Sequence, residues 1–146
     1  MLLRLLYYCI KTAPFAYMAL IWILSSLPQD AVIDTPYRWD RPFKESLHLI
    51  EFGILYVLFV LFFVVDGKLT RKTNVIAAVI AISYGFGDEL HQYFVPYRSA
   101  TVNDLVKDTI GVLVGYIVVK RFYFSNESTK LKAFLEGIRV KIGSTR

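Results

Sequence analysis

Four long apolar runs in the sequence limit the chain to folds that a membrane can hold. The hydrocarbon core of a bilayer is about 30 Å thick, and a helix needs about 20 residues to cross it. Runs of about that length cover residues 5–27, 47–65, 75–94 and 102–122. The chain of 146 residues is 55% hydrophobic and 20% charged, which is more apolar than an ordinary soluble domain. We therefore predict an all-α integral membrane protein that folds as one bundle of four transmembrane helices.

The third and fourth runs carry charged side chains inside their spans. The third run is purely apolar only over residues 75–86, so a full crossing must continue through Asp88 and Glu89. The fourth run carries Asp104 and Asp108 in its first two turns. A charge at the centre of a transmembrane helix costs at least about 2.5 kcal/mol, so such charges usually face one another or a wet cavity and mark function.

The distribution of Lys and Arg predicts the topology. Twelve of the 17 basic residues fall in the N-terminal segment, the second connection and the C-terminal tail, against five in the first and third connections and at the head of the fourth helix. Short cytoplasmic loops carry an excess of Lys and Arg. We therefore predict a multi-pass protein of the cell membrane with both termini in the cytoplasm. The same rule explains the net charge of +5 without a nucleic-acid partner.

In this topology the charged groups gather at the outward ends of three helices. At 1.5 Å of rise per residue, Glu51, Asp88 and Asp108 each lie roughly 5 to 9 Å below the outer interface. Helical spacing puts His48 beside Glu51, and Gln92 beside Asp88. We predict one outward-facing polar pocket. Its candidate residues are Lys44, His48, Glu51, Asp88, Glu89, Gln92, Arg98, Asp104 and Asp108.

Within this set the predicted roles differ. Asp88 and Gln92 share a helix face and are the stronger candidates, whereas Glu89 and His91 are more typical of a solvated helix end. Arg98 is expected to neutralise carboxylates, although its forked guanidinium suits a phosphate or carboxylate of a ligand equally well.

Two glycines continue the acidic face of the fourth helix. Gly111 and Gly115 follow Asp108 with the spacing of a small-xxx-small seam, where another helix can approach closely. We predict that this face points into the bundle.

The sequence favours neither a metal centre nor a cofactor. Carboxylates suit Mg²⁺ or Ca²⁺ in principle. However, there is no His-x-x-x-His pair, and the single Cys9 lies near the opposite end of the first helix. Acid–base chemistry by His48 with Asp88 or Asp108 stays open, so the catalytic residues are unknown.

The C-terminal segment 125–146 differs in character from residues 1–124. A polar link precedes apolar residues at helical spacing, with basic residues between them. The apolar positions are Leu131, Phe134, Leu135, Ile138 and Ile142. We predict a short amphipathic helix on the cytoplasmic leaflet, and a frayed soluble tail is the alternative.

The polar residues resemble the motifs of the VanZ-like membrane proteins. In that family a Lys…His-x-x-Glu stretch opens one helix, and an Asp-Glu-x-x-Gln…Pro-Gly-Arg…Asp-x-x-x-Asp/Asn-x-x-Gly stretch spans a later helix end and the next helix start. The matching residues are Lys44, His48, Glu51, Asp88, Glu89, Gln92, Pro96, Arg98, Asp104, Asp108, Gly111 and Gly115. Tyr97 replaces the expected glycine, and Lys44 lies one residue farther from the histidine than is usual. The resemblance covers about residues 15–120. It implies a four-helix membrane domain over residues 1–124, associated in the founding member with low-level resistance to the glycopeptide teicoplanin.

Three functions compete at this point. In the first, the pocket binds an extracytoplasmic amphiphile among the membrane lipids, such as a lipid-linked cell-wall precursor or a lipoglycopeptide. In the second, the chain is a small membrane enzyme acting on a phosphate- or acyl-bearing lipid. In the third, it is a structural subunit whose polar layer only joins helices, with the glycine seam used in a homo-oligomer.

Overall fold

The structure is all-helical in the part of the chain that it describes. The computed structural model describes residues 1–27, 40–96 and 101–144, with side chains in these ranges except over residues 40–48. The helices are α1 (Leu2–Ser25), α3 (Asp40–Val64), α4 (Arg71–Phe94), α5 (Val102–Phe122) and α6 (Lys130–Gly143). No strand occurs in these ranges, which confirms the all-α prediction.

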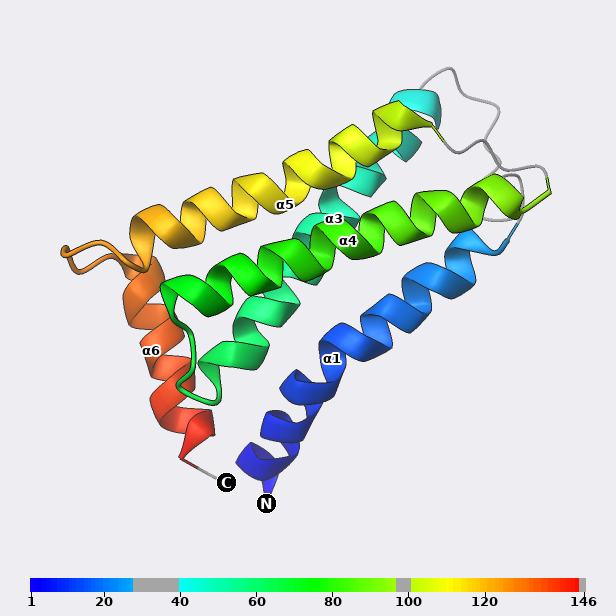
Figure 1. Cartoon of the computed structure of the whole chain (residues 1–146). Coiled ribbons are helices and arrows are strands. Elements are labelled where there is room, and N and C mark those ends of the chain that lie inside the picture. Colours follow the sequence, from blue (N-terminus) through cyan, green and yellow to red (C-terminus); the bar gives the residue numbers. More distant parts are fainter. Residues whose placement is uncertain (28–39, 97–100, 145–146) are drawn as a thin grey trace.

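Four helices run lengthwise and the fifth crosses one end. Figure 1 shows α1, α3, α4 and α5 along the length of the bundle, with α6 across the end where α1 begins. The α3 helix contacts every other described helix. Its buried side chains recur at helical spacing, because Phe52, Leu55, Tyr56, Phe59 and Val60 all fall on one stripe. The core therefore forms around α3.

The helices differ in their capacity to cross a membrane. Within the described residues, only α1 is both long and apolar enough for a span, and the apolar stretch Leu49–Val64 of α3 is shorter. By contrast, α4 and α5 have buried carboxylates in their sequences. Four transmembrane spans are therefore a proposal.

Glycine residues allow α3 and α5 to approach closely. A Cβ atom added to Gly53 would lie 3.5 Å from the carbonyl oxygen of Gly111, and one added to Gly111 would collide with the carbonyl oxygen of Leu49. One turn farther along α5, a Cβ on Gly115 would lie 2.7 Å from the ring of Tyr56. The glycine seam of α5, formed by Gly111 and Gly115, is thus packed against α3 of the same chain.

The amphipathic helix α6 packs against the bundle. Leu135 is buried, Leu131 and Ile138 are partly buried against the core, and Phe134 is 64% exposed. Burial raises the pKa of Tyr123 to about 12, so its phenol stays protonated at neutral pH. This phenol donates a hydrogen bond of 2.6 Å to Glu136 of α6. The apolar face of α6 is therefore directed mainly at protein.

At the same end, Asp66 joins α1 to the turn after α3. The hydroxyl of Tyr7 donates a hydrogen bond of 2.8 Å to one carboxylate oxygen, and the Nζ atom of Lys11 lies 3.0 Å from the other. The Lys11 ammonium also lies 3.1 Å from the ring centroid of Phe62. These contacts hold the first half of α1 on the bundle.

The close approach of α3 and α5 yields a stability prediction. Gly111→Ala should lower the free energy of unfolding by about 1 to 3 kcal/mol, because its methyl group needs the space of the Leu49 carbonyl and must push the helices apart. Thermal unfolding of the purified protein in detergent measures this loss.

Gly87→Ala is the matched control, because no atom lies within 4 Å of a Cβ added there. It should be neutral or slightly stabilising, since alanine favours helix over glycine. Equal melting temperatures for the two variants would contradict the proposed backbone contact.

Candidate functional site

The side chains of three residues of the predicted pocket lie outside the described part of the chain. Arg98 lies outside the described residues, and so do the side chains of Lys44 and His48 on α3. Their predicted roles therefore stay predictions. The remaining candidates are Glu51, Asp88, Glu89, Gln92, Asp104 and Asp108.

Asp88 and Gln92 lie together on the buried face of α4. Asp88 is 1% exposed and Gln92 is 4% exposed. The Nε2 atom of Gln92 donates a hydrogen bond of 2.7 Å to Oδ2 of Asp88. Their separation of four residues produces this contact, because such pairs are neighbours on a helix.

Glu89 is buried, so its interpretation as a solvated helix end was wrong. It is 8% exposed, and its Oε2 atom accepts a hydrogen bond of 3.1 Å from the backbone N–H of Thr101. Thr101 is the N-cap of α5. A carboxylate at this position is favourable, because the N-terminus of a helix carries a partial positive charge.

Asp104 belongs to the cap at the start of α5. Its Oδ2 atom accepts a hydrogen bond of 2.6 Å from the hydroxyl of Thr101, and its backbone N–H donates to that hydroxyl oxygen at 3.2 Å. Its other carboxylate oxygen lies 3.2 Å from Nζ of Lys107. These contacts assign Asp104 a local capping role at the edge of the polar region.

Asp108 lies one turn deeper, where α4 and α5 touch. It is 1% exposed, and its Cβ lies 3.5 Å from the position of a Cβ added to Gly85. Asp88 follows Gly85 by three residues on the buried face of α4. The face of α4 that carries Gly85 and Asp88 therefore packs toward Asp108 of α5 and Phe52 of α3.

Two tyrosines extend the polar region to α1. The partly buried Glu51 is close enough to interact electrostatically with the hydroxyls of Tyr17 and Tyr84. The hydroxyl of Tyr84 also interacts electrostatically with Asp88. It donates a hydrogen bond of 2.6 Å to the backbone carbonyl of Met18 on α1. Sequence reasoning missed both tyrosines, because an uncharged aromatic residue in an apolar run does not stand out.

His91 contacts α1 and takes no part in the buried face. Its ring stacks on Trp22 with centroids 3.9 Å apart, and its Nε2 atom lies 2.9 Å from the hydroxyl of Ser26. The Ser26 hydroxyl also donates to the carbonyl of Trp22 at 2.7 Å. This contact joins the last turn of α1 to the last turn of α4.

The described side chains include no group of three or more His, Cys, Asp or Glu residues arranged to hold a metal ion. What they do form is a set of buried or partly buried acceptors from three helices. We use the name carboxylate layer for Glu51 of α3, Asp88 of α4 and Asp108 of α5. Such a layer can accept hydrogen bonds from a polar group and can balance a positive charge.

Comparison with known proteins identifies the family of the chain. The family model described as VanZ/LLP1 matches residues 5–123, which is most of the sequence. No curated protein and no solved structure matches the chain. The matched region contains the carboxylate layer together with nearly all of α1 and the whole of α3, α4 and α5. The chain therefore belongs to the VanZ/LLP1 family.

Proposed function

We propose that this protein binds the headgroup of an extracytoplasmic amphiphile at the carboxylate layer, as a multi-pass protein of the cell membrane. The amphiphile is a lipid-linked cell-envelope intermediate or a lipoglycopeptide antibiotic. At the level of the family, membership of VanZ/LLP1 fits an association with teicoplanin resistance. The headgroup would occupy the polar layer while the acyl chain stays in the surrounding lipid.

One observation carries this proposal. Asp88 and Asp108 are each 1% exposed inside the bundle, in a chain of high apolar content. Buried ionisable groups are costly, and replacing them by apolar residues of similar volume is often neutral or stabilising. Their presence is therefore better explained by binding than by stability.

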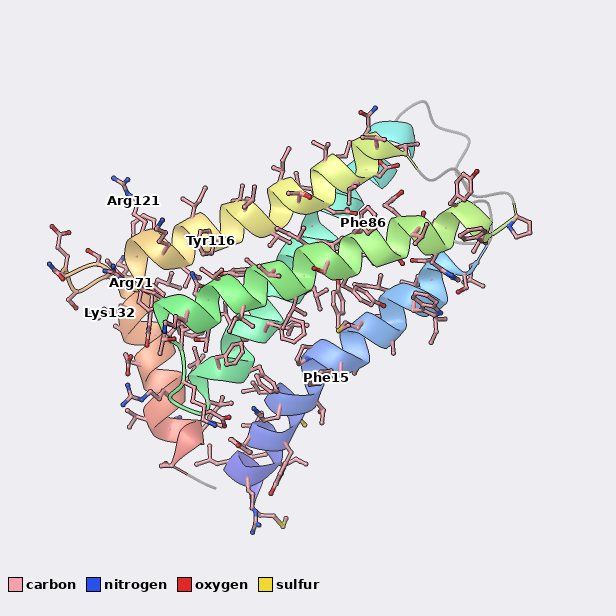
Figure 2. All side chains as sticks on the ribbon, in the orientation of Figure 1. Phe15, Arg71, Phe86, Tyr116, Arg121 and Lys132 are labelled. Carbon is pink, nitrogen blue, oxygen red and sulfur yellow. The ribbon has the colours of Figure 1, made fainter. Side chains whose placement is uncertain are left out.

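The exposed surface supports several spans. Large apolar side chains point outward along the length of the bundle, including Phe15 of α1, Phe86 of α4 and Ile117 of α5, each more than half exposed. Figure 2 labels Phe15 on α1 and Phe86 on α4. An apolar surface that follows several helices is normally covered by lipid or by a partner.

The basic residues support the proposed orientation. Arg71, Arg121 and Lys132 gather near α6 in Figure 2, at the end where α1 begins. The carboxylate layer lies toward the opposite end of the same helices. Because short cytoplasmic segments are enriched in Lys and Arg, the α6 end would face the cytoplasm and the layer would face outward.

The orientation can be tested by cysteine labelling in a Cys9→Ser background. Asn126→Cys should stay unlabelled by a membrane-impermeant maleimide in intact cells and should react once the cells are permeabilised. Asn103→Cys is the control at the other end, where the side chain is exposed, and it should react in intact cells. Labelling of position 126 in intact cells would show that the termini are outside.

The binding role of the layer can be tested with isosteric variants. Glu51→Gln and Asp108→Asn keep side-chain size while removing charge, so they should abolish protection against teicoplanin without changing the amount of protein in the membrane. Protection is measured as the inhibitory concentration for cells that express each variant at matched levels.

Glu136→Gln is the matched control for this test. It removes one carboxylate from α6, where Glu136 pairs with Arg139 and Tyr123 far from the layer. It should retain protection. If the layer serves only to hold the helices together, Glu51→Gln and Asp108→Asn will instead lower the yield of protein. The protection per folded molecule will then be unchanged.

A further inference from the structure

One oxygen atom of the carboxylate layer is buried without a hydrogen-bond donor among the described residues. It is Oδ1 of Asp88, a residue that is 1% exposed. The other oxygen, Oδ2, accepts from Gln92 at 2.7 Å, which fixes the carboxylate on the buried face of α4. Oδ1 is thus an oriented acceptor inside the bundle.

Two described donors of this region are committed to other acceptors. The backbone N–H of Thr101 donates to Glu89, and the hydroxyl of Tyr84 donates to the carbonyl of Met18. A buried acceptor without a donor loses the hydrogen bonds that water would supply, and this loss is greater for a charged group. A ligand that completes the layer should therefore bring a donor to Asp88.

We propose that the headgroup of the bound amphiphile presents a protonated primary amine to Oδ1 of Asp88. This inference rests on the proposed function and names the chemistry that the layer recognises. An ammonium group carries three N–H donors and a positive charge, so it satisfies the acceptor and forms a charge-assisted hydrogen bond with the carboxylate of Asp88. A phosphate or carboxylate group offers only acceptors and would be repelled at this atom.

Three soluble probes with the same acyl chain test this selection. They are lauroyl lysophosphatidylethanolamine, its N-acetylated derivative, and lauroyl lysophosphatidylglycerol. The first carries an ammonium group, the second has lost that charge, and the third offers neutral hydroxyl donors. Each is titrated by calorimetry into the full-length protein in dodecyl maltoside. We expect the ethanolamine probe to bind at least about tenfold more tightly than the other two, as a charge-assisted hydrogen bond implies.

Asp88→Asn tests the residue itself. An asparagine side chain can keep its carbonyl oxygen toward Gln92 and place its NH₂ group where Oδ1 was, so a donor replaces the acceptor. This variant should lose the preference for the ethanolamine probe. Glu136→Gln removes a carboxylate from the opposite end of the bundle and should keep the preference.

The possible results separate the two proposals. Equal binding of all three probes to the natural protein would overturn the amine inference and leave the binding function standing. Equally tight binding of the glycerol probe and the ethanolamine probe would mean that a hydroxyl suffices, which also overturns it. Binding of no probe would count against both proposals. The comparison of headgroups needs no variant, so it decides the question even if Asp88→Asn fails to fold.

Discussion

The close contact of α3 with α5 determines where the polar groups of this protein meet. Gly53 and Gly111 allow the two backbones to touch, and this contact sets the register between the helices. With that register, Glu51 of α3 and Asp108 of α5 each lie within one turn of the glycine at the crossing on their own helix. Larger residues would separate the helices, because an added Cβ on Gly111 has no room.

Polar contacts hold α1 on the rest of the bundle at both of its ends. The carboxylate of Asp66 accepts hydrogen bonds from Tyr7 and Lys11 near the start of α1, and His91 stacks on Trp22 near the end of α1. Between these contacts α1 presents mostly apolar side chains, and in a membrane such a surface gains little from contact with other apolar helices. The polar contacts therefore position α1 beside the carboxylate layer, where Tyr17 extends the polar region.

The VanZ/LLP1 assignment and the geometry address different questions. The family match covers residues 5–123. At the level of the family, it fits an association with teicoplanin resistance. The geometry identifies Oδ1 of Asp88 as a buried acceptor without a donor among the described residues, and the proposed ligand contact rests on this atom. Together they are the basis of the proposal that the protein binds a polar headgroup at the carboxylate layer.

The helices, the candidate carboxylates and the family could be predicted from the sequence, because each depends on residues that are close together in the chain. Long apolar runs form helices in any membrane-like setting, and charges inside them, such as Asp88 and Asp108, stand out because they are costly. The outcome for Glu89 was decided only by tertiary structure, because its partner is a backbone N–H twelve residues away. The pairing of His91 with Trp22 likewise joins residues far apart in the chain. Contacts of this kind depend on how helices pack, and helical periodicity within one segment carries no information about the neighbour that will face it.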